Sequence, residues 1–134
     1  TLWIHPRRGF VEEQQRANGG VALCPYSLKP IGIEKLFSSE VDIDHILPYS
    51  RTLDDSSANR IICYHDTNRL KRNKSPFESL GQNTIWAEIV ANAQGLAKNK
   101  SWRFGPEAME RFEKKEFQVG AELIGLDDAT SDSE

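Results

Sequence analysis

Hydrophobic residues recur at helical spacing in three stretches of the chain. The first covers residues 7–18, and Gly19-Gly20 supplies a left-handed stop directly after it. The second and longest covers residues 84–99. Gly105-Pro106 opens the third, in which Met109 is expected to point inward. The pattern predicts that each stretch is an amphipathic helix packed by one face.

Two shorter stretches are rich in β-branched residues and are typical of strands. Residues 41–46 alternate Val-Asp-Ile-Asp-His-Ile, and Pro48 should end this strand because proline cannot donate to a sheet. Residues 59–64 form the second strand. A basic helix, capped by Asp66 or Thr67, is expected to follow at once. Two short strands followed directly by a basic helix are the central feature of the predicted fold.

The segments between these elements are marked by proline, glycine and polar residues. Residues 24–30 contain two prolines and are expected to form turns, and the polar residues 50–58 a loop. Residues 33–37 fit either a short helix or a short strand. Ser75-Pro76-Phe77-Glu78 matches a capping box and predicts a helix start, with a stop at Gly81.

The composition is that of an ordinary globular domain, with 134 residues of which 38% are hydrophobic and 28% charged. No apolar run approaches the roughly 20 residues that a membrane helix needs, and no signal peptide precedes the first polar residues. The chain begins at Thr1 and its only methionine is Met109, so we expect an excised or processed piece. Cys24 and Cys63 stand outside any C-x-x-C pair, so we expect no structural zinc and favour reduced thiols over a disulfide.

The net charge of −3 is unevenly distributed. Residues 107–134 hold nine acids and three bases, which makes −6 and leaves +3 on the rest of the chain. Residues 60–74 hold a basic cluster against the single acid Asp66: Arg60, Arg69, Lys71, Arg72 and Lys74. Such a cluster can meet phosphate, although charge alone favours a solvated helix face.

Candidate chemistry gathers at the first strand and the basic helix. Histidine has an unperturbed pKa that suits a general base near neutral pH, which nominates His45. The oxygen donors of Asp44 and Asn68 favour Mg²⁺ or Mn²⁺ over zinc, and two suffice because magnesium keeps several waters. Lys71 lies one turn beyond Asn68 and could touch a phosphate. Phosphodiester hydrolysis requires a base that takes a proton from water and positive charge that stabilises the phosphate oxygens.

The dipeptide Asp44-His45 also sets a geometric condition. Neighbours on a regular strand point to opposite faces, so the strand must end or bulge there if both are to serve one phosphate. Each residue taken singly has a simpler interpretation: a surface Asp-His pair, a helix-start Asn68 and a solvated Lys71. His65 is an alternative metal ligand to Asn68, or an exposed residue at the helix start. Asn59 is expected to hydrogen-bond the loop and hold His45 in place.

Together these positions form a specific pattern. Asp-His-Ile-x-Pro is followed by asparagine fourteen residues beyond the histidine, asparagine at twenty-three and lysine at twenty-six. The pattern resembles the HNH nuclease motif, in particular the HNH domain of the type II CRISPR RNA-guided effector nucleases (the Cas-nine family) and its compact members. The similarity runs from about Arg7 to Phe117 and includes Cys24-Pro25-Tyr26-Ser27, Pro48-Tyr49-Ser50-Arg51, Asp54-Asp55-Ser56 and Pro76-Phe77-Glu78.

The resemblance implies an α+β fold, a ββα-metal finger whose two-stranded antiparallel ribbon is embedded in helices. It implies a single domain over residues 1–134, with a core at about 7–117 and a linker or tail at 118–134. His45 would activate water as the general base, and Asp44 and Asn68 would bind the catalytic Mg²⁺, for which Mn²⁺ could substitute. The remaining implied roles are loop holding by Asn59, assistance at the phosphate by Lys71, and nucleic-acid contact by Lys71, Arg69, Arg72 and Lys74.

The implied activity is cleavage of the DNA strand paired to a guide RNA, leaving a 3′-hydroxyl and a 5′-phosphate, in antiviral defence in the prokaryotic cytoplasm. The implied partners are the target DNA strand, the guide RNA and a RuvC-containing remainder of the effector, with no membrane and a monomeric chain. The RuvC-like segments and the arginine-rich helix are missing here, so this piece would not itself read a guide. Two alternatives stay open: a free-standing HNH endonuclease of homing or phage type, and a non-catalytic HNH-like module.

Overall fold

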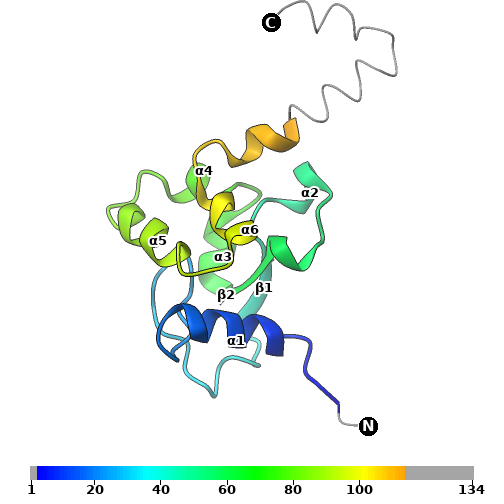
Figure 1. Ribbon diagram of the computed structural model, residues 1–134, viewed down its shortest axis with the longest axis vertical. Coiled ribbons are helices and arrows are strands. Elements are labelled where there is room, and N and C mark those ends of the chain that lie inside the picture. The colour runs from blue at the N-terminus through cyan, green and yellow to red at the C-terminus, as the bar shows by residue number, and fades with distance from the viewer. Residues whose placement is uncertain (1–2, 114–134) are drawn as a thin grey trace, which may run out of the picture.

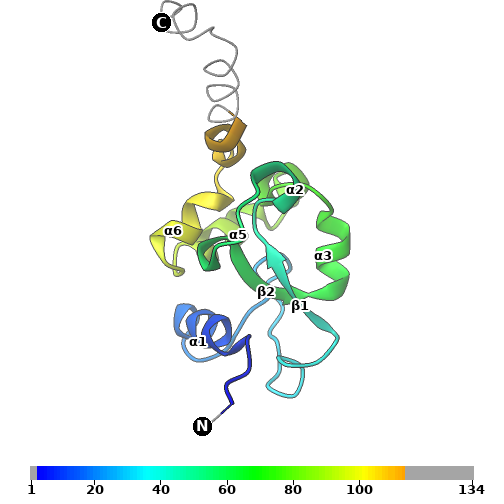
Figure 2. The ribbon, with the colours of Figure 1, turned by 90° about the vertical axis from the view of Figure 1, so that its right-hand side faces the viewer.

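A two-stranded antiparallel sheet lies at the centre of the computed structural model, which describes residues 3–113. Its strands are β1 (Val41–His45) and β2 (Arg60–Tyr64), and the register pairs Val41 with Tyr64 and His45 with Arg60. The helix α3 (His65–Lys71) follows β2 directly and packs against both strands (Figure 2). This arrangement confirms the predicted α+β class and the strand–strand–helix unit.

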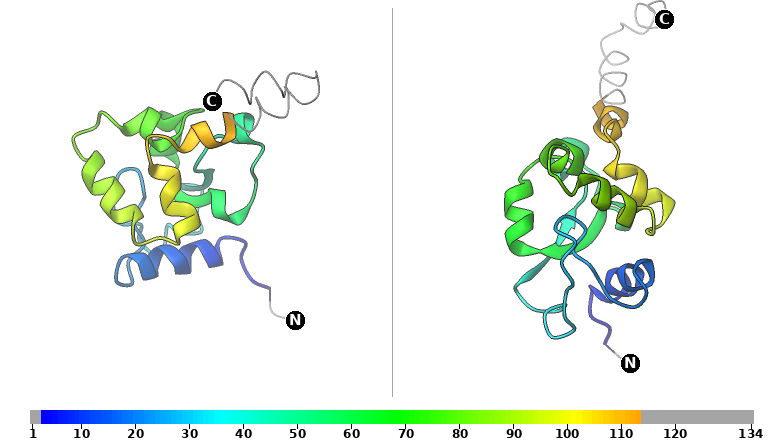
Figure 3. Two further views of the ribbon diagram at one scale, coloured as in Figure 1. Left: turned by 45° about the horizontal axis from the view of Figure 1, so that its top comes forward. Right: turned by 90° about the vertical axis from the view of Figure 1, so that its left-hand side faces the viewer.

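The helix α1 (Arg8–Ala17) lies across β2, on the side of the sheet away from α3 (Figures 1 and 3). Its buried Gln14 donates from Nε2 to the carbonyl oxygen of Ile62 at 2.9 Å and accepts from the Ile62 amide at 2.8 Å. The side-chain amide thus takes the place of a third strand at the open edge of β2. The helix ends as predicted, because Gly19 and Gly20 adopt positive φ angles of 64° and 103°.

Short helices complete the domain around the sheet and the loop between its strands. They are α2 (Tyr49–Thr52), η1 (Ser57–Asn59), α4 (Pro76–Leu80), α5 (Trp86–Ala93), α6 (Lys98–Ser101), η2 (Trp102–Phe104) and a helical segment at 108–113. The prediction of one helix over residues 84–99 is wrong, because a turn around Gly95 separates α5 from α6. The polar stretch 50–58, predicted as a loop, contains parts of α2 and η1.

Two further local predictions differ from the structure, and one agrees. Residues 33–37 form turns instead of a helix or a strand. The start of α3 has no side-chain cap, because the helix begins at His65 and so places Asp66 and Thr67 inside its first turn. The His65 amide donates to the carbonyl oxygen of Glu40 at 2.9 Å. The predicted capping box is present, since the hydroxyl of Ser75 accepts from the Glu78 amide at 3.1 Å.

The main hydrophobic core lies between the sheet and the helices. Its buried members include Leu36, Val41, Ile61, Ile62, Ile89 and Phe104. Cys24 and Cys63 are buried free thiols, as predicted. No helix in this part of the chain combines the length and the apolar character that crossing a membrane requires. The predicted tail at 118–134 lies outside the described residues.

Candidate functional site

Asp44 is held by two donors on one of its oxygens. The hydroxyl of Tyr26 donates to Oδ2 at 2.6 Å, and Nζ of Lys71 lies 3.1 Å from the same atom. Burial raises the pKa of Tyr26 well above its usual value, and the charge of Asp44 raises it further, so the phenol stays a donor. Within residues 3–113 no hydrogen bond engages Oδ1 of Asp44, and the side chain is 12% exposed. One carboxylate oxygen is therefore committed to the protein and the other is open.

Lys71 is buried beneath the sheet, with a side chain that is 1% exposed. Its Nζ donates to the carbonyl oxygen of His45 at 3.0 Å and lies 5.4 Å from the ring centroid of Tyr26. The interpretation of Lys71 as a solvated residue is therefore wrong, and its assistance at a phosphate stays a prediction. The reason is that α3 packs directly against both strands, so a side chain on its last turn is enclosed.

Asn68 contacts Asp42, a residue that the sequence analysis did not single out. Oδ2 of Asp42 accepts from Nδ2 of Asn68 at 3.0 Å and lies 2.7 Å from Nδ1 of His65. Because an ionised carboxylate only accepts, the amide nitrogen of Asn68 faces Asp42 and its oxygen faces away. Alternation along β1 places Asp42 and Asp44 on one face, and that Asp-x-Asp spacing was the available signal.

His45 points to the opposite face of β1, toward the loop between the strands. Its Nε2 lies 2.7 Å from Oδ1 of Asp55, and its ring lies beside that of Tyr49, with centroids 5.4 Å apart. The strand pairs regularly up to His45 and ends there, so Asp44 and His45 still point to opposite faces of β1. That both side chains serve one phosphate stays a prediction.

Asn59 ties the two ends of the loop that carries Asp55. Its buried side chain accepts from the amide of Leu47 at 3.0 Å and donates to the carbonyl oxygens of Leu47 and Asp54 at 2.9 Å and 2.8 Å. Asn59, at the β2 end of the loop, thus bonds to Leu47 near the β1 end and to Asp54 in the middle of the loop. That it also holds His45 in place stays a prediction.

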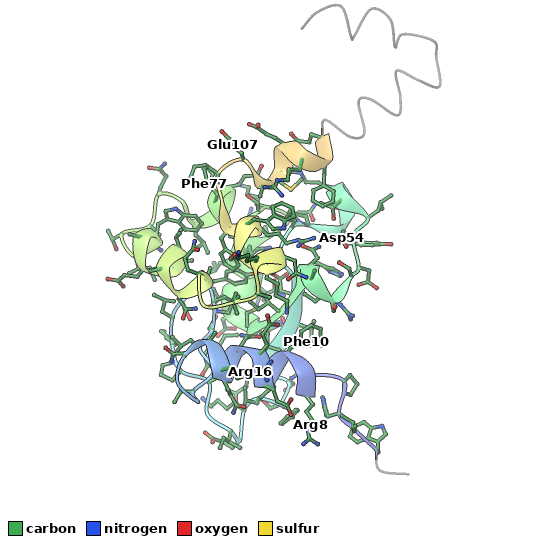
Figure 4. All side chains as sticks on the ribbon, in the orientation of Figure 1. Arg8, Phe10, Arg16, Asp54, Phe77 and Glu107 are labelled. Carbon is green, nitrogen blue, oxygen red and sulfur yellow. The ribbon has the colours of Figure 1, made fainter. Side chains whose placement is uncertain are left out.

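Two arginines join this loop to the helical part of the domain. Nη2 of Arg103 lies 2.7 Å from Oδ2 of Asp54, which Figure 4 shows on the inter-strand loop. Burial alone would raise the pKa of Asp54, but hydrogen bonds from Ser56 and the ion pair with Arg103 hold it below its usual value. Arg51 pairs with Glu78 at 2.5 Å and with Glu113 at 2.8 Å. No spacing rule in the sequence announces such distant partners.

The donor set around α3 suits a hard divalent cation. No three His, Cys, Asp or Glu side chains among residues 3–113 converge on a point that could hold a metal ion. The open oxygen of Asp44 and the amide oxygen of Asn68 are both hard donors of the kind that Mg²⁺ takes, and that they hold one ion stays a prediction. Three basic residues beside them are exposed: Arg69, Arg72 and Lys74.

Residues 24–77 match the HNH endonuclease family. The chain is 38% identical over 82 residues to the CRISPR-associated endonuclease Cas9 of Campylobacter jejuni subsp. jejuni, covering 60% of this chain and 8% of that protein. It is 32% identical over 110 residues to CRISPR-associated endonuclease Cas9 1 of Streptococcus thermophilus, covering 75% of this chain and 10% of that protein. The chain thus spans about a tenth of the length of these relatives.

The chain is also similar to solved structures of Cas9. Streptococcus thermophilus Cas9 in complex with the GGAA PAM superposes with a TM-score of 0.64 at 27% identity, over 77% of this chain and 11% of that one. Streptococcus thermophilus Cas9 in complex with AGGA PAM has the same TM-score of 0.64 at 23% identity, over 92% of this chain and 14% of that one. The second likeness establishes a shared fold.

Proposed function

Since this chain carries an HNH endonuclease domain similar to those of Cas9 proteins, we propose that it is a Mg²⁺-dependent DNA endonuclease module that cuts the guide-paired target strand within an RNA-guided effector. The observation that carries the proposal is that Asp44 and Asp42, the partner of Asn68, share the face of β1 that meets α3, and that the same strand ends on His45. A hard-cation site beside a general base is what phosphodiester hydrolysis requires.

His45 is proposed to take the proton from the attacking water. Because Nε2 faces the carboxylate of Asp55, which only accepts when ionised, Nε2 carries the hydrogen and the lone pair stands on Nδ1. Nδ1 is therefore the atom that would accept the proton. Asp44 and Asn68 would hold the metal ion. A bound Mg²⁺ neutralises charge on the non-bridging phosphate oxygens and on the departing 3′ oxygen.

The proposed substrate is a DNA strand that lies along the exposed basic side chains of α3 and of the turn after it. Arg69, Arg72 and Lys74 would contact its phosphates, while the buried Lys71 would hold Asp44 and the backbone of His45. Guide pairing and PAM reading would belong to the guide RNA and to a RuvC-containing remainder of the effector, in the division of labour that defines RNA-guided recognition. The proposed setting is antiviral defence in the prokaryotic cytoplasm.

Cleavage of single-stranded DNA by the 134-residue chain tests this function. The parent, His45→Ala and the control His5→Ala are compared in Mg²⁺ and in EDTA. Nδ1 of His5 accepts from the Arg7 amide at 3.1 Å, and its ring packs beside those of Trp3 and Phe37. We expect weak, metal-dependent cutting by the parent and by His5→Ala, and a loss of about 10²-fold or more in His45→Ala, the size of general-base catalysis. Undiminished cutting by His45→Ala would contradict the assignment of the base.

A further inference from the structure

We propose that Tyr26 is a positioning residue for the metal site: with Lys71 it holds Oδ2 of Asp44 and so presents Oδ1 to the ion. The inference rests on the proposed function, because it concerns the metal that Asp44 would bind. Nothing in the HNH pattern as read from the spacing of Asp44, Asn59 and Asn68 assigns a role to this tyrosine.

The phenol of Tyr26 is rigidly placed. The residue is 1% exposed and sits in a tight turn closed by a bond from the Leu28 amide to the carbonyl oxygen of Cys24 at 2.8 Å. Its ring packs near that of Phe104, with centroids 6.2 Å apart, and lies beneath Nζ of Lys71. A tyrosine has two side-chain torsions, and both are restrained by this packing. Its hydroxyl therefore reaches Asp44 from a fixed point.

Two donors on one oxygen determine how the carboxylate of Asp44 can turn. Turning the carboxylate about its last torsion away from this orientation would break the 2.6 Å bond to Tyr26 and the 3.1 Å contact with Lys71 together. Both donors are almost fully buried, so water does not replace them readily. Asp44 is thus prepared to offer a single oxygen, which suits a cation that takes only one or two protein ligands.

A purely structural tyrosine would behave differently, and the chain offers one for comparison. The hydroxyl of Tyr64 donates to the carbonyl oxygen of Pro30 at 2.6 Å, a bond of the same length to an uncharged acceptor away from Asp44. Tyr26→Phe and Tyr64→Phe remove the same atom and one hydrogen bond each. Only the first removes a bond to the proposed metal ligand.

A Mn²⁺-binding titration of the 134-residue chain tests the inference without any cleavage assay. Binding is measured as the decrease of the electron paramagnetic resonance signal of free Mn²⁺. We expect Tyr26→Phe to weaken Mn²⁺ binding by about 10-fold, the lower end of the effect of removing a partner of a metal ligand. Tyr64→Phe should bind within about 2-fold of the parent, since it leaves Asp44 untouched. Parental affinity in Tyr26→Phe, or an equal loss in both variants, would overturn the inference.

A second variant and the parent chain distinguish failure of this inference from failure of the proposed function. Circular dichroism verifies folding, and Lys71→Met, which removes the other donor to Oδ2, should weaken Mn²⁺ binding in the same direction. If Lys71→Met binds as the parent does, the two-donor arrangement does not act on the metal and the inference fails. Failure of the proposed function has a different signature, because the parent chain then binds no Mn²⁺ at all, which overturns both.

Discussion

Nε2 of His45 lies 2.7 Å from Oδ1 of Asp55, so an exposed acid from the inter-strand loop orients the proposed base. The contact selects the tautomer with its lone pair on Nδ1. It also restrains the imidazole, whose ring lies beside that of Tyr49. The loop that carries Asp55 is in turn held by Asn59, Arg51 and Arg103.

Asp55→Ala is expected to slow cleavage by about 10-fold, a part of the 10²–10⁴-fold that a general base supplies, because the imidazole loses its orienting acceptor. Asp55→Asn keeps an acceptor oxygen and should lose less. We expect kcat to fall and KM for DNA to stay nearly unchanged, since Asp55 is not proposed to contact DNA. Asp66→Ala removes an exposed acid from α3 and serves as the control. Equal kcat values for Asp55→Ala and the parent would contradict this role.

Asn68→Ala and His65→Ala separate the two candidate ligands on α3. Both side chains contact Oδ2 of Asp42, but only the amide of Asn68 has an oxygen left for a cation. Titration with Mn²⁺ should therefore show a loss of about 10-fold or more in Asn68→Ala and little change in His65→Ala. The reverse result would mean that His65 is the ligand.

Arg69 and Lys74 are expected to set the salt dependence of DNA binding. Each exposed basic side chain that neutralises a phosphate of single-stranded DNA contributes about −0.7 to the slope of the logarithm of the binding constant against the logarithm of the salt concentration. The double alanine variant should therefore reduce the magnitude of that slope by about 1.4. Fluorescence anisotropy at several salt concentrations measures it. Lys98→Ala, an exposed lysine on the distant α6, is the matched control (Figure 2). An unchanged slope in the double variant would place the DNA elsewhere.

Acid should unfold the domain partly through Asp54 and Glu78. Their pKa values lie below the usual 3.8 and 4.5, for Glu78 mainly because of Arg51, so the unfolded chain binds protons more readily. The stability they provide is fully present above about pH 5 and is lost as the pH falls through these values. Thermal unfolding from about pH 7 to about pH 3 should show a flatter dependence in Asp54→Asn than in the parent.

The same substitution should cost about 3 kcal/mol at neutral pH, because it leaves the nearly buried Arg103 without its carboxylate. Glu88→Gln, an exposed change on α5, should cost almost nothing and should leave the pH dependence as in the parent. If Asp54→Asn retained the parent's stability at both ends of the pH range, the ion pair would not stabilise the loop.

Local signals were sufficient for the elements whose cause is local. The capping box at Ser75 needs only residues within one helical turn, and the stop at Gly19 needs only a left-handed conformation, so both were predictable. The start of α3 was not, because Glu40 supplies the acceptor for its first amide from across the sheet. The break at Gly95 likewise overrides a helical pattern that continues on both sides of it.

The sequence by itself determined the candidate residues for the chemistry: the Asp44-His45 pair and its spacing to Asn59 and Asn68 are properties of the chain order. Only the tertiary structure decided what each atom faces. Tyr26 reaches Asp44 across 18 positions and Arg103 reaches Asp54 across 49, and packing of α3 on the sheet encloses Lys71 instead of leaving it to solvent. Such contacts depend on how elements pack, which periodicity and spacing do not encode.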